Sequence, residues 1–202
     1  MVAHPPEPPA DLHARRLPFR TIDAGTPLWR VHDAGRHPVW FGPAPGVPPR
    51  SRFDAPGGEF RVCYVALTPE AAFAETFLRN PGRRMLDATL IDSRALSTLA
   101  PTRALRVVRL HGPGLARVGA TAEVSHGPAY DVAHRWALAL WSHPSRPDGI
   151  LYTSRHDDDE FCVALFERDA GDLRVDAQQA LIGTPLLTAL LRRYRVSLDP
   201  SS

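Results

Sequence analysis

The sequence predicts an α+β fold, with one domain built on a central mixed or antiparallel sheet flanked by helices. Strand-like and helix-like segments are interspersed without the regular alternation of a doubly wound sheet. The chain has 202 residues, the size of one domain, and contains no internal repeat. We divide it into a proline-rich N-terminal arm over residues 1–25 and a main domain over residues 26–200.

The first half of the chain alternates proline-rich segments with short apolar runs. Proline and glycine interrupt regular structure, whereas β-branched, aromatic and small residues favour strands. Thr68 followed by Pro69 is typical of a helix start. The expected elements are a loose arm over 1–18, a strand over 28–31, a long loop over 38–56, a strand over 62–67 and a helix from Thr68 to about Asn80.

The second half contains one clearly amphipathic segment, from Tyr130 to Trp141, whose apolar residues fall on adjoining helical stripes. Arg192 and Arg193 come at the end of the segment 184–194, where positive charge stabilises the negative C-terminal end of a helix. The expected elements are strands over 86–91 and 105–110, a short helix capped by Asp92 or Ser93 and ending at Leu99, a helix over 130–141, strands over 149–153 and 161–166, and a helix over 184–194.

Composition excludes several classes of protein. The net charge of +2 is too small to indicate direct nucleic-acid binding. All basic residues are arginine, so a Schiff-base lysine and a P-loop lysine are excluded. Cys63 and Cys162 lie in apolar runs and are expected to be buried thiols of a reducing compartment. Because neither a signal peptide nor a membrane span is apparent, we expect a soluble, cytoplasmic protein without membrane contact.

Five polar side chains stand among apolar neighbours and form the candidate site. Arg30 and Arg52 offer guanidinium forks that bind phosphate oxygens, and Glu75 lies within a helix between apolar residues. Tyr64 is in the middle of a strand, and Ser154 follows one. Guanidinium, carboxylate and hydroxyl groups without a strong nucleophile suit an anionic, sugar-containing substrate. The ordinary alternative is that the charged residues are surface groups, that Tyr64 belongs to the core and that Ser154 is a turn residue.

The run from His156 to Glu160 holds three consecutive aspartates, which suggests a metal at first sight. Consecutive residues point in different directions, and the spacing fits neither a zinc nor an EF-hand site. We therefore interpret it as an acidic hairpin turn and predict no metal. Among the histidines, His126 is the one whose loop context would let it line a cleft.

In order and spacing, these segments resemble the RES domain, a toxin family named for its Arg, Glu and Ser residues. The resemblance covers about residues 26–168. It is carried by Trp29-Arg30-Val31, Ser51-Arg52-Phe53, Tyr64 ahead of the helix Thr68–Glu75, and Asp148–Arg155, with further matches at Trp136–Ala139 and Cys162–Phe166.

The resemblance implies a fold like that of ADP-ribosyltransferases and cleavage of the nicotinamide–ribose bond of NAD+. NAD+ is then a substrate, no cofactor is needed, and inorganic phosphate or water is the acceptor. It further implies catalytic roles for Arg30, Glu75 and Ser154, with Arg52 and Tyr64 binding substrate. Arg30 and Arg52 would hold phosphates, Tyr64 the ribose next to nicotinamide, and Glu75 the developing positive charge, with Ser154 anchoring substrate beside it. It also implies a cognate DNA-binding antitoxin.

Two alternatives remain open at this stage. The same fold could transfer ADP-ribose onto a macromolecule as a mono-ADP-ribosyltransferase. The chain could instead be a non-enzymatic nucleotide-binding module whose arginines are surface charge.

Overall fold

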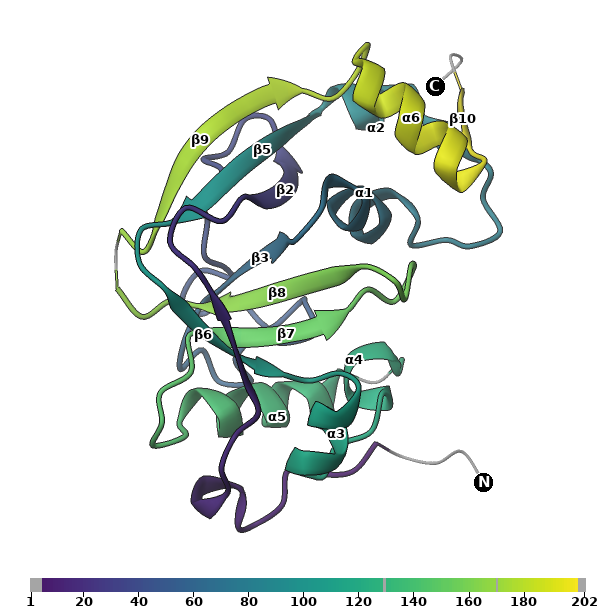
Figure 1. The fold of residues 1–202 in the computed structure, drawn as a ribbon. Helices are drawn as coiled ribbons and strands as arrows, with labels where there is room; N and C mark the ends of the chain where they lie inside the picture. Colours follow the sequence, from purple (N-terminus) through teal and green to yellow (C-terminus); the bar gives the residue numbers. More distant parts are fainter. Residues whose placement is uncertain (1–4, 129, 170, 200–202) are drawn as a thin grey trace.

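A computed structural model describes residues 5–128, 130–169 and 171–199. It confirms the α+β fold with a large central mixed sheet (Figure 1). The eight strands of this sheet lie in the order β1-β6-β7-β8-β3-β2-β5-β9. Neighbouring strands are antiparallel except β6 and β7, which are parallel. Strands β4 and β10 form a separate two-stranded parallel sheet.

The elements alternate irregularly along the chain, as the sequence predicts. The strands are β1 (Phe19–Ile22), β2 (Leu28–Asp33), β3 (Val62–Ala66), β4 (Met85–Asp87), β5 (Arg94–Pro101), β6 (Leu105–Arg109), β7 (Gly149–Thr153), β8 (Phe161–Phe166), β9 (Leu173–Ala180) and β10 (Ser197–Asp199). The helices are α1 (Pro69–Phe77), α2 (Ala88–Asp92), α3 (Pro113–Val118), α4 (Glu123–His126), α5 (Asp131–Trp141) and α6 (Pro185–Tyr194), with a 3₁₀ turn at Leu12–Ala14.

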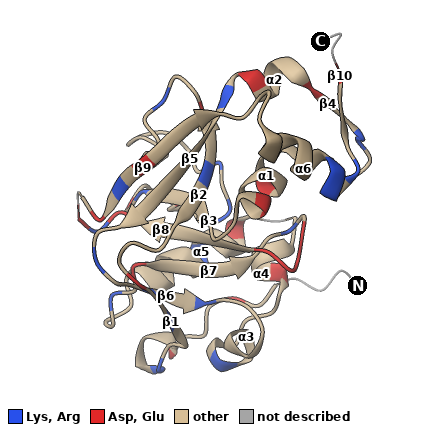
Figure 2. Cartoon of the chain, turned by 45° about the horizontal axis from the view of Figure 1, so that its top comes forward, with Lys and Arg blue, Asp and Glu red and all other residues tan. Residues whose placement is uncertain are grey.

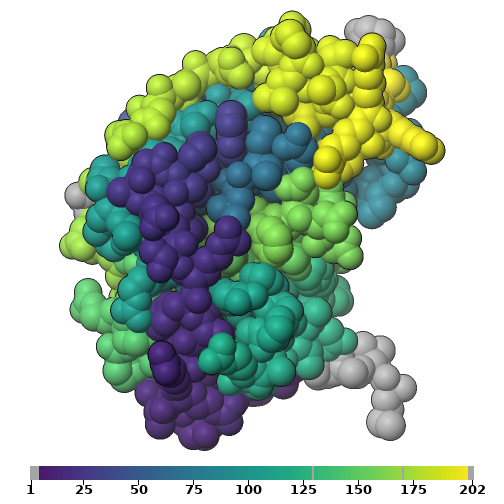
Figure 3. Space-filling model, viewed as in Figure 1, coloured from purple at the N-terminus to yellow at the C-terminus, as the bar shows by residue number. Residues whose placement is uncertain are grey.

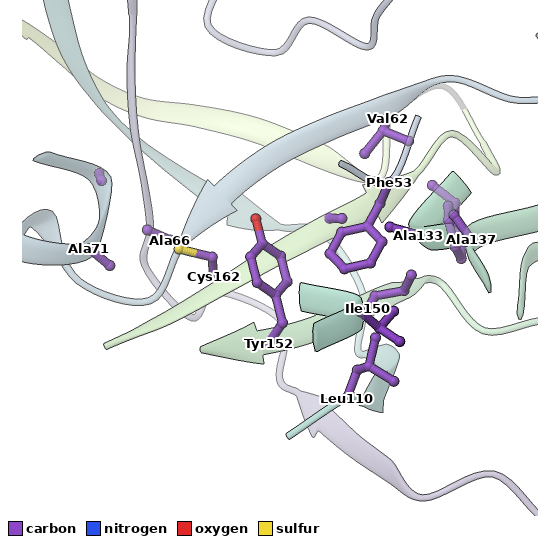
Figure 4. Packing of buried hydrophobic residues seen from close by; sticks show 14 of the residues in the cluster. Phe53, Val62, Ala66, Ala71, Leu110, Ala133, Ala137, Ile150, Tyr152 and Cys162 are labelled. Atoms are coloured by element: carbon purple, nitrogen blue, oxygen red, sulfur yellow. The ribbon is translucent and has the colours of Figure 1, made fainter. Parts of the chain in front are cut away.

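Two hydrophobic clusters make up the core. The larger one joins the sheet to α1, α5 and α6 and includes Trp136 and Phe73. Figure 4 shows part of it, where the rings of Phe53 and Tyr152 meet edge to face with their centroids 5.0 Å apart. The smaller cluster holds buried residues from several of the same strands, among them Leu28 and Leu151. The central strands therefore carry apolar residues into both clusters, and the helices cover the larger one.

Residues 5–18 do not form the loose arm that their prolines suggest, and residues 1–4 of the expected arm lie outside the described residues. Leu12 and Leu17 are buried in the larger cluster, and β1 pairs with β6 at the edge of the sheet. The indole of Trp136 donates to the carbonyl of Pro6 at 2.7 Å, and Glu7 accepts two hydrogen bonds from Arg135. Tertiary contacts with α5 thus order a segment that has no periodicity of its own. The boundary that we drew after residue 25 stays a prediction.

The region after residue 85 differs from the expected strand over 86–91. The strand ends at Asp87, whose carboxylate accepts hydrogen bonds from the amides of Thr89 and Leu90 and thereby caps α2. The helix expected from Asp92 or Ser93 to Leu99 is wrong as well. This segment is β5, which lies between β2 and β9, so pairing on both sides outweighs its local helical preference.

The other expected elements occur within a few residues of their predicted limits. Strands β1, β9 and β10 and helices α2, α3 and α4 were not predicted, because they are short or largely exposed and carry little periodic signal. Within the described part of the chain, no helix has the length and apolar character needed to cross a membrane.

Candidate active site

A cavity of about 400 Å³ opens between α1 and the α4–α5 region. It is lined by residues of β2, β3, α1, the segment after β7 and the loop that joins β2 to β3. Arg30, Arg52, Tyr64 and Glu75 all line it, and Ser154 is hydrogen-bonded to Glu75. The structure therefore brings the five predicted side chains together, although they are far apart in the sequence.

Glu75 comes from α1, which begins where the sequence predicts. The Thr68 hydroxyl accepts a hydrogen bond from the Ala71 amide, and Pro69 occupies the first turn. Buried Phe73 and Phe77 fix the helix to the core, so the half-buried Glu75 faces the end of β7. One carboxylate oxygen accepts from the Ser154 hydroxyl at 2.6 Å and from the Arg155 amide at 2.9 Å. Two donors thus hold the carboxylate in one orientation.

Ser154 lies behind Glu75 and is fully buried, with 0% exposure. Its amide donates to the Glu160 carbonyl at 2.8 Å, and its hydroxyl also accepts from the His156 amide at 3.2 Å. The hydroxyl is therefore fixed by the turn between β7 and β8. In this arrangement Ser154 acts on Glu75, and the direct substrate contact that the resemblance implies stays a prediction.

Arg52 is only 8% exposed, which is unusual for an arginine. It donates to the Gly127 carbonyl at 2.8 Å, and its guanidinium lies over the Tyr130 ring, 4.5 Å from the centroid. Burial lowers the pKa of Arg52 from its very high usual value, and the group stays protonated at neutral pH. The result is a fixed, partly desolvated cation in the cavity wall.

Asp54 was missed by sequence reasoning, and it organises the loop that carries Arg52. It is 2% exposed, and its carboxylate accepts from the amides of Arg50 at 2.9 Å and Ser51 at 2.7 Å. The Tyr64 hydroxyl donates to it at 3.0 Å and accepts from the Phe53 amide at 2.9 Å. Burial and the adjacent carboxylate raise the pKa of Tyr64 well above its usual value, so Tyr64 stays a hydrogen-bond donor.

Arg30 belongs to β2 and lines the cavity. It donates to the Trp40 carbonyl at 3.1 Å and to the Cys63 sulfur at 2.7 Å. Cys63 and Cys162 are free and buried, as the sequence predicts, and burial raises the pKa of both thiols. Neither thiol is therefore activated as a nucleophile.

The charge of the cavity is strongly asymmetric. Five arginines line it, and Glu75 is the only carboxylate that does so among the described residues. The arginines are Arg30, Arg50, Arg52, Arg79 and Arg155. Such a lining favours a ligand with several negative charges, and the guanidinium geometry suits phosphate oxygens. The separate contributions of Arg50, Arg79 and Arg155 were not predicted, because in a chain so rich in arginine none of them has a distinctive local pattern.

His156 also lines the cavity, although the sequence places it in an acidic turn. Burial lowers the pKa of His156, opposed by Glu75 and reinforced by nearby Arg155, Arg79 and Arg52. The imidazole is therefore mainly neutral at neutral pH. The position of His156, two residues after the predicted Ser154, could have indicated that it belongs to the site. We instead interpreted it together with the aspartates that follow it as part of an acidic turn.

His126 lines a second cavity of about 550 Å³ together with Thr153, Arg155 and His156. One of its ring nitrogens lies 3.3 Å from the Thr153 hydroxyl. His126 is the last residue of α4, so the expected loop context is wrong, but it does line this neighbouring cavity. Within residues 5–128, 130–169 and 171–199, no three His, Cys, Asp or Glu side chains are grouped so that they could hold a metal ion.

Comparison with known proteins identifies the family of this chain. Residues 27–184, most of the chain, match the model of the family described as the RES domain. The chain therefore belongs to the RES-domain family.

One curated relative and one solved structure are similar to this chain. "Probable toxin y4kH" of Sinorhizobium fredii (strain NBRC 101917 / NGR234) is 31% identical over 78 residues, which are 39% of this chain and 61% of that protein. The match thus spans less than two thirds of that relative. A chain in the crystal structure of the M. tuberculosis MbcT–MbcA toxin–antitoxin complex superposes with a TM-score of 0.65 and 20% identity. This superposition covers 86% of our chain and 92% of the other, and it shows a shared fold.

Proposed function

We propose that this protein degrades NAD+ by cleaving the bond between nicotinamide and ribose, and that it is the toxin of a toxin–antitoxin pair. The observation that carries the proposal is a single carboxylate, Glu75, held by Ser154 and Arg155 inside a cavity lined by five arginines. The arginines match the diphosphate of the substrate. Membership of the RES family and the similarity to proteins named as toxins support the assignment.

The proposed reaction needs charge stabilisation more than proton transfer. The bond between ribose C1 and the pyridinium nitrogen breaks, and its electron pair leaves with nicotinamide, which becomes neutral. Positive charge develops on the ribose, and the oriented carboxylate of Glu75 stabilises it. An oxygen of phosphate or water then bonds to C1, and attacking water loses a proton. Because the leaving group is already cationic, no strong general acid is required.

Each residue has a defined part in this scheme. The Arg52 and Arg30 guanidinium groups bind the phosphates and fix the dinucleotide relative to Glu75. Tyr64 supports the loop that bears Arg52 and presents its ring to the cavity. No metal or redox group takes part in these steps. The partner that the toxin assignment implies is a cognate antitoxin with a DNA-binding domain.

The test is to incubate the purified protein with NAD+, with and without phosphate, and to measure free nicotinamide. We expect release by the wild type and a loss of about 100-fold or more in Glu75→Gln, which keeps the shape of the side chain. Glu70→Gln, on the same helix but outside the cavity lining, is the matched control. Label from the ADP-ribose part retained on a macromolecule would favour a transferase instead. If the folded wild type releases no nicotinamide, the proposal is overturned, and the absence of any shift of Tm by NAD+ would show that the protein does not bind the dinucleotide.

A further inference from the structure

The acidic turn between β7 and β8 directs two of its carboxylates into the protein. The side chains of Asp157 and Glu160 are only 14% and 11% exposed, whereas Asp158 and Asp159 face solvent. A carboxylate that is removed from water in this way requires hydrogen-bond donors from the protein. The turn is therefore packed against the rest of the protein, and the hydrogen-bond partners of Asp157 and Glu160 identify the segments that it contacts.

The donors come from the end of α6, far away in the sequence. Arg193 donates to Asp157 at 3.3 Å and to Glu160 at 3.0 Å, and the Tyr194 hydroxyl donates to Asp157 at 2.8 Å. Figure 2 shows the red acidic turn close to the blue arginines of α6, and Figure 3 shows this yellow helix packed over the neighbouring segments. The match to the RES-domain model ends at residue 184, immediately before α6 begins at Pro185.

The same network extends to the beginning of α1. The Thr68 hydroxyl, which caps α1, donates to the Glu160 carboxylate. The Tyr194 ring stacks on Phe73 of α1, with centroids 5.8 Å apart and planes inclined by 10°. Glu160 thus joins the turn, α6 and α1, and α1 is the helix that bears Glu75.

We propose that Arg193 and Tyr194 are positioning residues for the active site. By fixing the turn against α1, they keep the Ser154 hydroxyl and the Arg155 amide on the Glu75 carboxylate. The connection is short, because the Ser154 amide is bound to the Glu160 carbonyl and the Glu160 amide to the Asp157 carbonyl. Releasing the turn would free the two donors that orient Glu75. Only the kinetic part of this inference rests on the proposed function.

The first measurement is hydrogen exchange, which does not depend on activity. Tyr194→Phe removes one hydroxyl and keeps the ring on Phe73, and Arg193→Gln removes the charge. We expect exchange of the Arg155 amide to be about tenfold faster in both variants, with the Val163 amide in β8 unchanged. Arg192→Gln, an exposed neighbour on α6, is the matched control and should resemble the wild type. Exchange at Arg155 within about twofold of wild type in both variants would overturn the inference.

The second measurement is the kinetics of nicotinamide release. We expect kcat to fall about three- to tenfold in Tyr194→Phe and Arg193→Gln, with the KM for NAD+ unchanged within about twofold. Arg193→Lys should recover part of the loss, because it restores the positive charge. Unchanged kcat in both variants would contradict the positioning role. If the wild type releases no nicotinamide at all, the proposed function fails, and hydrogen exchange still decides the structural inference.

Discussion

Two walls of the cavity hold their charged groups by different means. The α1 wall consists of Glu75, Arg155 and His156, with Ser154 behind it, and is supported by a helix and the end of a sheet strand. The loop wall consists of residues 50–52, which have no regular structure and depend on the buried Asp54 behind them. The α1 wall is therefore built on regular secondary structure, whereas the loop wall depends on one buried carboxylate. Loss of Asp54 should therefore act mainly on stability, whereas loss of a hydrogen-bond donor to Glu75 should act mainly on catalysis.

The largest effect on stability is expected for Asp54→Ala. The substitution leaves the Arg50 and Ser51 amides and the Tyr64 hydroxyl without their acceptor in a buried site. We expect a loss of about 3 kcal/mol in the free energy of unfolding, measured by urea denaturation. Asp159→Ala, which changes an exposed aspartate, should cost less than about 0.5 kcal/mol. Equal stability of the two variants would mean that Asp54 does not hold the loop wall.

Ser154→Ala tests the α1 wall. Loss of the hydroxyl removes one of the two donors on Glu75 while the Arg155 amide remains. We expect kcat for nicotinamide release to fall about 10- to 100-fold, with a loss of stability of only about 1 kcal/mol. The control is Ser125→Ala, which also removes a buried hydroxyl, in this case one from a residue of the cavity lining. If the Ser125 variant loses as much activity as the Ser154 variant, the α1 wall has no special role.

The difference between the walls also explains what the sequence could predict. Glu75 and Ser154 follow strong local signals, a capped helix and an apolar strand, so their positions could be inferred. Arg30, Arg52 and Tyr64 were recognised through the order of motifs, and the structure places all three in the same cavity. Asp54 escaped prediction because its role depends on donors brought to it by a loop and by β3. Similarly, most of β5 was predicted as a helix because Asp92 and Ser93 are typical helix-capping residues. The pairing of this segment with β2 and β9 depends on residues far away in the sequence and could not be inferred locally.

The smallest expected effect concerns pH, and it also distinguishes the walls. His156 on the α1 wall has a pKa lowered from its usual 6.5, chiefly by burial, while Arg52 on the loop wall stays charged. The unfolded chain therefore binds the proton more readily than the folded one. The free energy of unfolding should be highest above about pH 6.5, where His156 is neutral in both states. It should fall as the pH decreases from there toward the pKa of His156 in the folded protein.

This pH dependence is measured by NMR titration of the imidazole and by urea unfolding between pH 7.5 and 5. The titration midpoint of His156 should lie below 6.5, the usual value. His156→Asn should show a weaker decrease of stability on acidification than the wild type. A midpoint above the usual value would mean that the attraction of Glu75 outweighs burial, and the description of this wall would be wrong.

The central claim is that the protein cleaves the nicotinamide–ribose bond of NAD+ in its arginine-lined cavity. In this proposal the oriented Glu75 carboxylate stabilises the positive charge that develops on the ribose. The most direct test is the rate of nicotinamide release from NAD+ by the wild type and by Glu75→Gln, at equal concentrations of folded protein. We predict clear release by the wild type and a decrease of about 100-fold or more in the variant. Equal rates in the two proteins, or no release by a folded wild type, would contradict it.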